Sequence, residues 1–335
     1  RYTALMLDDR KAVILSAVVQ EYIETAQPVG SGRISDAPGI DVSSATVRNE
    51  MVALEEAGYL AQPHTSAGRV PTDKGYRFFV DRLRSERPVL DRADQGTVID
   101  FFARAHGELE SMLTDTSALL TDLTDWTAVV VGPTVDDATI RSVQLVDLAS
   151  HHVLVVAVMS NGVIEKRTVE VESELTHEMV EDAGRRLATA VEGRTLRELG
   201  EPPGGIADDP LALAAVDALR AAGSVAEVFV GGASRVASAF EAVERVRDVL
   251  AVLEQQIVVV SLITDVLERG QRVAIGEETG VDTLADCALV VAPYEVDGEQ
   301  AGTIGVLGPT RMDYSQALSA VAVVSRRLGN ALSEG

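Results

Sequence analysis

The hydrophobic pattern of the chain changes its period near residue 126, and this change constrains the fold most. Before it, apolar residues recur at the spacing of amphipathic helices, as in the pairs four apart between Ile14 and Ile23. After it, short apolar runs with period two predict strands at 126–132, 139–148, 152–159 and 163–171. Strand patterns return at 272–276, 287–292 and 302–307, before a final helix at about 313–332. The sequence therefore predicts an α+β fold.

A mostly helical stretch separates the two groups of strands. Helical patterns occupy most of 209–265, with one strand at 227–230, and the strongest breaker in the chain (EPPGG, 201–205) precedes them. Strands on both sides of this stretch suggest one domain that is interrupted by an insertion. We therefore assign residues 85–195 and 266–335 to the α+β domain, with a long helix at about 95–122, and residues 196–265 to the insertion.

The first 84 residues predict a separate unit. Helices are expected at 9–25, 31–37 and 43–58, where Ser43 suits an N-cap and Gly58 a C-terminal stop. Two short extended pieces then flank a turn, and Thr72 begins a further helix. Three helices followed by a small hairpin are typical of a winged helix-turn-helix.

The charge of the chain is unevenly distributed. The net charge is -23, which by itself argues against binding to nucleic acid. Residues 1–90, however, hold 11 Lys and Arg against 12 Asp and Glu, so nearly all of the excess negative charge lies in the remainder. A nearly neutral N-terminal unit joined to an acidic remainder suggests that the two parts have different tasks.

Composition excludes several other classes of protein. No uncharged apolar run approaches the roughly 18 residues that span a bilayer, so we expect no membrane contact. The single cysteine, Cys287, excludes a disulfide framework and a thiolate zinc site and favours a cytoplasmic location.

The helix expected at 43–58 carries the candidate base-reading residues. At about 100° per residue, Val47, Met51 and Leu54 share one face and should pack against the other helices. In the major groove Arg bonds to guanine, Asn to adenine, and Ala or a Thr methyl group touches the thymine methyl group. The residues that point the other way, in the first two turns, are Ala45, Thr46, Arg48 and Asn49.

Hydroxyl and cationic side chains around this helix are candidates for contacts to the DNA backbone. Ser43 and Ser44 lie at its start, although an N-cap alone would explain one of them. The small polar loop at 63–69, which ends in the cation Arg69, suits the wing of a winged helix. Lys74 and Arg77 could contact phosphate or could equally lie on a solvated helix face. The full set of candidates is Ser31, Ser43, Ser44, His64, Thr65, Ser66, Arg69, Lys74 and Arg77.

No catalytic or metal-binding constellation is visible in the sequence. Gly302, Gly305 and Gly308 are three apart, which matches neither a dinucleotide fingerprint nor a P-loop and favours close packing around a strand. His151 and His152 are adjacent on a predicted strand, so their side chains should point to opposite faces. We therefore expect neither an enzyme nor a bound cofactor or metal.

Several segments of the chain resemble the family of heat-inducible transcription repressors, HrcA. The matching segments are EYIET (21–25), PVGS (28–31), VSSATVRNEM (42–51) and QPHTSAGRVPTDKGYR (62–77). A C-terminal signature, GTIGVLGPTRMDY (302–314), and the weaker segments FVGGAS (229–234) and IGEE (275–278) follow in the order of the family.

The resemblance implies a fold and a mechanism. The α+β domain should be GAF-like, and the insertion should form the dimer. The protein should bind as a homodimer to an inverted-repeat operator of double-stranded DNA and repress chaperone operons until heat shock. The GroE chaperonin should bring the repressor into its active form, and misfolded clients should compete for that chaperonin.

Two other functions stay open at this point. The GAF-like domain would bind a small effector in a ligand-sensing repressor, an idea that rests on fold analogy alone. A winged helix used only for protein contacts would show no sequence-dependent binding to DNA.

Overall fold

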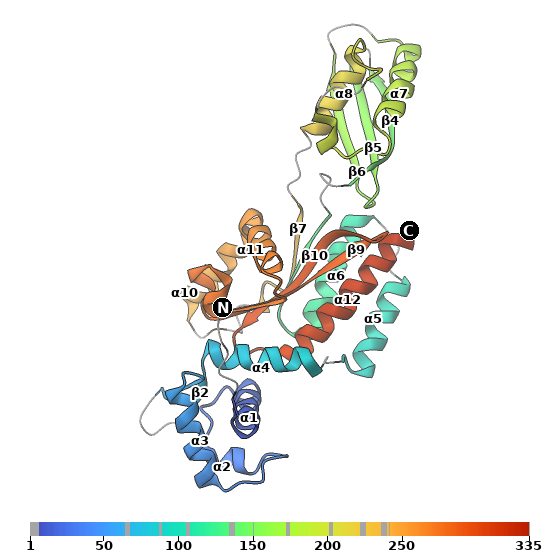
Figure 1. Ribbon diagram of the computed structural model, residues 1–335. Helices are drawn as coiled ribbons and strands as arrows, with labels where there is room; N and C mark the ends of the chain where they lie inside the picture. Colours follow the sequence, from blue (N-terminus) through green and yellow to red (C-terminus); the bar gives the residue numbers. More distant parts are fainter. Residues whose placement is uncertain are drawn as a thin grey trace.

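The computed structural model describes residues 7–63, 68–86, 89–104, 108–133, 138–149, 151–171, 175–200, 204–221, 226–235, 240 and 242–334. The molecule has three parts, which follow one another in space (Figure 1). We call them the head (residues 7–86), the body (residues 89–133 and 226–334) and the inserted unit (residues 138–221). The head and the inserted unit lie at opposite ends of the body. The mixture of helices and sheets confirms the predicted α+β class.

The head has the predicted order of elements. It contains α1 (Asp9–Thr25), α2 (Ser31–Ser35), α3 (Ser44–Glu56), β1 (Leu60–Ala61), β2 (Val70–Pro71) and α4 (Asp73–Glu86). The two strands pair antiparallel and form a small hairpin after the third helix.

Local sequence explains where the helices of the head begin and end. Asp8 caps α1 by accepting a hydrogen bond from the Lys11 backbone nitrogen, and Ala26 ends that helix in the left-handed region at φ 53°. Ser43 caps α3 in the same way, as its hydroxyl accepts from the Thr46 nitrogen. Helix α3 therefore begins at Ser44, within one residue of the start that the sequence predicts.

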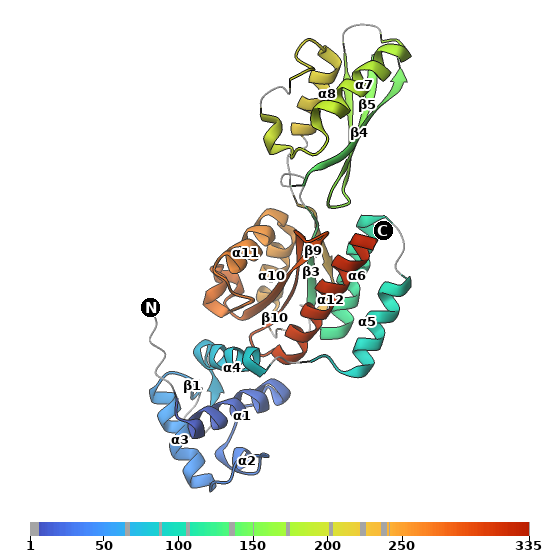
Figure 2. The ribbon, with the colours of Figure 1, turned by 45° about the vertical axis from the view of Figure 1, so that its right-hand side comes forward.

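The body is built on one five-stranded sheet in the order β7-β3-β10-β9-β8. Its strands are β3 (Thr127–Val131), β7 (Val228–Gly231), β8 (Val273–Ile275), β9 (Cys287–Val296) and β10 (Glu299–Pro309). Its helices are α5 (Arg92–Arg104), α6 (Leu109–Thr124), α10 (Val243–Glu254), α11 (Gln256–Glu268) and α12 (Tyr314–Glu334). Helices α6 and α12 cover one face of the sheet, with α5 packed against α12, and α10 and α11 cover the other face (Figure 2).

Strand β3 shows why both faces of this sheet must be covered. Ala128 and Val130 pack into the core with α6 and α12, whereas Val129 and Val131 pack into the core with α10 and α11. Alternate side chains of a strand point to opposite faces, so a strand that is apolar throughout is buried on both. The single helix expected at 95–122 is wrong, because two helices, α5 and α6, occupy this stretch.

The inserted unit has its own three-stranded sheet, in the order β4-β5-β6. Its elements are β4 (Ile140–Ala149), β5 (His152–Met159), β6 (Ile164–Glu170), α7 (His177–Val191), η1 (Arg197–Gly200) and α8 (Pro210–Arg220). Both α-helices pack on the same face of the sheet, around a core that includes Val155, Ala157, Leu187 and Val216.

The predicted boundaries of the insertion, 196–265, differ from those in the structure. Strands β4, β5 and β6, expected in the α+β domain, pair only with one another within the described chain. Strand β7 and helices α10 and α11, expected in the insertion, belong to the body. The breaker at 201–205 does not mark the edge of the inserted unit, because α8, which follows it in the sequence, still packs on the sheet of that unit.

Among the described residues, no single helix is long and apolar enough to cross a membrane. The bent pair of helices α10 and α11 would be long and apolar enough together, by length and composition alone, but both helices contribute to the core of the body.

Candidate nucleic-acid interface

Helix α3 presents the four candidate base-reading residues on its outer side. Val47, Met51 and Leu54 are fully buried against the rest of the head. Ala45, Arg48 and Asn49 are exposed, and Thr46 is half-buried. The side chains of Arg48 and Asn49 make no hydrogen bond or ion pair with the part of the chain that the structure describes. The first two turns of α3 therefore leave a guanidinium and an amide available to a ligand.

Hydroxyl groups gather where α2 and α3 begin. The Ser31 and Ser44 hydroxyl oxygens are 3.1 Å apart, so the starts of the two helices are adjacent. The Ser43 hydroxyl lies 3.1 Å from the Thr46 hydroxyl and also accepts from the Thr46 nitrogen. Ser43 is thus occupied as an N-cap, while Ser31 and Ser44 form an exposed pair beside free backbone N–H groups of α3.

Two of the three carboxylates of α3, those of Glu50 and Glu55, are paired with cations from neighbouring elements, and Glu56 at the end of the helix is exposed. Glu50 lies 3.5 Å from Arg10 and 3.4 Å from Lys11 of α1. Glu55 lies 2.9 Å from the Nε atom of Arg69, next to the hairpin. Because Glu50 is paired, Arg48 carries the charge on the first two turns of α3 that has no partner among the described residues.

Arg69 and Lys74 each have a partner within the head, although the Lys74 side chain remains exposed. The Arg69 side chain is only 13% exposed, it is paired with Glu55, and its backbone pairs with Val29. The Lys74 ammonium donates to the Ala57 carbonyl at 2.7 Å and lies 4.3 Å from the centre of the Tyr59 ring. Both cations therefore stabilise the C-terminal end of α3 and the hairpin.

Arg77, expected either at the DNA backbone or on a solvated helix face, is bound by the body in this structure. Its guanidinium forms a two-point ion pair with Glu278, with one distance of 2.9 Å, and donates to the Val273 carbonyl at 2.8 Å. Both partners belong to the body, so Arg77 fixes the head to the body. His64, Thr65 and Ser66 lie outside the described residues.

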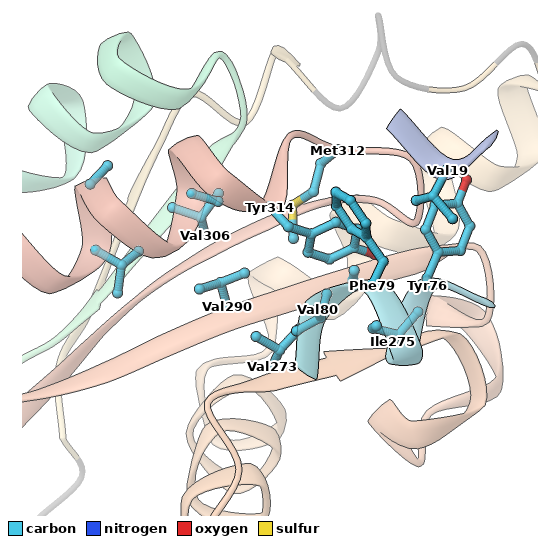
Figure 3. Close-up of a cluster of buried hydrophobic side chains, with 14 of the residues drawn as sticks. Val19, Tyr76, Phe79, Val80, Val273, Ile275, Val290, Val306, Met312 and Tyr314 are labelled. Carbon is cyan, nitrogen blue, oxygen red and sulfur yellow. The ribbon is translucent and has the colours of Figure 1, made fainter. Parts of the chain in front are cut away.

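Three of the segments that resemble the family meet where the head touches the body, and we call this contact the seam. Residues 72–77 supply α4, residues 275–278 supply the end of β8 and the η2 turn (Gly276–Thr279), and residues 309–314 lead into α12. Tyr76, Phe79 and Val80 of α4 lie against Ile275 and Tyr314 of the body (Figure 3). The rings of Tyr76 and Tyr314 are 6.0 Å apart. The core of the head therefore continues into the core of the body.

At one point the seam requires a glycine. Gly276 has φ +55°, and a Cβ atom there would overlap the Asp73 carboxylate. The same carboxylate accepts a long hydrogen bond, 3.4 Å, from the Glu277 nitrogen. Burial, together with the nearby negative charges of Glu277 and Glu278, raises the pKa of Asp73 above its ordinary value.

Sequence reasoning missed the seam although it had singled out its segments. It interpreted residues 72–77 as DNA contacts and the glycines at 302–308 as packing elements. The latter interpretation agrees with the structure, since a Cβ atom at Gly302 would overlap Tyr294, and one at Gly305 would lie 3.0 Å from the Val290 carbonyl. The pairing of a basic α4 with the acidic segment at 277–278 was the one available signal.

The described residues form open cavities of different sizes, including one of about 760 Å³ in the inserted unit, lined by residues such as Val171, Met179 and Leu211. No group of three or more His, Cys, Asp or Glu is placed to hold a metal ion among the described residues. Burial raises the pKa of the Cys287 thiol to about 12, so it stays protonated. The cavity between Trp126 and Cys287 measures about 10 Å³, room for no more than one water molecule.

Comparison with known proteins identifies the family. The family model described as the HrcA protein C-terminal domain matches residues 110–318. A heat-inducible transcription repressor HrcA of Acidothermus cellulolyticus is 38% identical, over 98% of this chain and 100% of its own length. The corresponding protein of Thermobifida fusca is 36% identical, over 98% of each chain.

A solved structure shares the fold along the whole chain. A crystal structure described only as a hypothetical protein is 25% identical, covers 98% of this chain and 99% of its own, and superposes with a TM-score of 0.67. These curated relatives are named heat-inducible transcription repressors, and they match this chain over nearly their full length. The chain therefore belongs to the HrcA family of heat-inducible transcription repressors.

Proposed function

We propose that this repressor acts in the cytoplasm and reads an inverted-repeat operator with the first two turns of α3, one helix in the major groove of each half-site. Arg48 and Asn49 are the residues expected to bond base edges, with Ala45 and the Thr46 methyl group beside them. The proposal rests on the exposed side chains of Arg48 and Asn49, which have no partner among the described residues and lie on a helix where Glu50 and Glu55 are paired with cations. Ser31 and Ser44 are proposed to contact the adjacent phosphate.

The inserted unit supports a homodimer. Helices α7 and α8 cover one face of its sheet, and the other face carries the exposed apolar side chains Val146, Leu148 and Ile164, each between 41% and 54% exposed. Leu154 and Val156 alternate onto this same open face. An apolar sheet face of this kind favours pairing with a second copy, and a two-fold protein suits a two-fold DNA site.

Control by heat follows from the family. We propose that the GroE chaperonin maintains the active form and that misfolded clients withdraw it during heat stress. Operator binding measured across the heat-shock range, with and without chaperonin, tests this step. Full and reversible binding without chaperonin at every temperature would contradict it.

A gel shift on the promoter of this organism's own chaperonin operon tests the DNA-binding proposal. We expect a retarded complex that survives excess random DNA and contains two protein chains. Binding to operator and scrambled DNA with equal affinity would contradict sequence reading, and would favour a head that is used for protein contacts.

A further inference from the structure

Val52 is the one exposed large apolar side chain in the described part of the head. It lies on α3 and is 39% exposed. The other large aliphatic side chains of that helix, Val47, Met51 and Leu54, are completely buried. A single exposed valine is ordinary on most surfaces, so its position on the helix must decide whether it has a role.

Val52 continues the stripe of residues that we propose to face DNA. It follows Ala45 by seven residues and Arg48 by four, which places it about 20° and 40° from them around the helix axis. Ala45, Arg48 and Val52 therefore point the same way on consecutive turns. A duplex that follows this face of α3 one turn beyond Arg48 would also meet Val52.

The chemistry of the valine side chain selects its contact. Val52 offers methyl groups and no hydrogen-bonding atom, and its branched side chain has few rotamers. The apolar group presented by base pairs in the major groove is the thymine C5-methyl group. Along the axis, Val52 lies about 6 Å from Arg48, which corresponds to roughly two base-pair steps.

We propose that Val52 reads a thymine in each half-site by packing against its C5-methyl group, about two base pairs from the base that Arg48 contacts. This inference rests on the proposed function and extends it, because it adds a specificity-determining residue and predicts the identity of one more base.

Replacement of thymine by uracil in the operator tests the contact, because uracil lacks only the methyl group. Wild-type protein and the Val52→Ala variant are titrated, by fluorescence anisotropy, with operators in which each thymine in turn is uracil. We expect uracil at one position per half-site to weaken wild-type binding about fourfold, the equivalent of one buried methyl group. The Val52→Ala variant should bind the thymine operator more weakly and should not respond to uracil at that position.

The Val243→Ala variant is the matched control, since Val243 is also on a helix and is 78% exposed but lies in the body. It should show the wild-type response to every uracil. Identical uracil profiles for wild-type protein and Val52→Ala would overturn the contact while leaving the proposed function intact. Absence of any sequence-specific binding by the wild type would instead overturn the proposed function, and this inference with it.

Discussion

Removal of the Arg77 guanidinium should loosen the seam between head and body. The Arg77 side chain is 20% exposed and that of its partner Glu278 is 32% exposed, so the ion pair is neither fully solvated nor fully buried. Exposed pairs contribute up to about 1 kcal/mol, and breaking a buried pair costs about 3–5 kcal/mol. Glu278 still accepts from the Ile275 nitrogen at 3.0 Å after the change, which limits the penalty. We therefore expect Arg77→Ala to lower the free energy of unfolding by about 2 kcal/mol.

Urea denaturation measures this loss. The single tryptophan, Trp126, reports the body, and hydrogen exchange of the α4 amides reports the helix that crosses the seam. Arg84→Ala is the matched control, because Arg84 is exposed on the same helix, and it should change the stability by less than about 0.5 kcal/mol. A double-mutant cycle with Glu278→Ala should give a coupling energy of at least about 1 kcal/mol.

The reasoning would be refuted if Arg77→Ala and Arg84→Ala unfolded at the same urea concentration. A coupling energy near zero between Arg77 and Glu278 would have the same meaning. In either case the apolar contacts around Tyr76 and Tyr314 would hold the seam without the ion pair.

Two further substitutions test the account of the head. The raised pKa of Asp73 means that stability linked to this group is present at low pH and is lost as the pH rises through the folded-state pKa. Asp73→Asn should therefore raise the urea midpoint at pH 7, and the gain over wild type should vanish as the pH falls below about 4; a gain that persists there would contradict the assignment. Arg69→Ala leaves Glu55 without its partner, so it should reduce stability by about 1–2 kcal/mol while leaving the salt dependence of operator binding unchanged. If the slope of log affinity against log salt concentration fell by about one, Arg69 would instead contact a phosphate.

Local signals in the sequence were sufficient to predict the head. Ser43 caps α3, and the spacing of Val47, Met51 and Leu54 selects the buried face, because both effects depend on residues within two turns. The exposure of Ala45, Arg48 and Asn49 follows from the same geometry. These features are decided by neighbours in the chain and do not require the rest of the fold.

Long-range pairing explains what the sequence did not reveal. The pattern identified strands at 126–132 and 139–148 but could not show that β3 pairs with β10 and β7 while β4 pairs with β5. Arg77 on α4 resembled a solvated cation because its partner, Glu278, lies 201 residues further along the chain. Strand order and the seam depend on contacts of this kind, which a local pattern does not encode.

The ratio of specific to non-specific DNA affinity, compared between wild-type protein and Arg48→Ala, tests the central claim most directly. Both affinities are measured at one salt concentration, with an operator and a scrambled duplex of equal length. If Arg48 bonds a base, its loss should lower the ratio by roughly 5- to 150-fold, about 1–3 kcal/mol, with little effect on scrambled DNA. An equal loss of affinity for both duplexes would contradict base reading by α3.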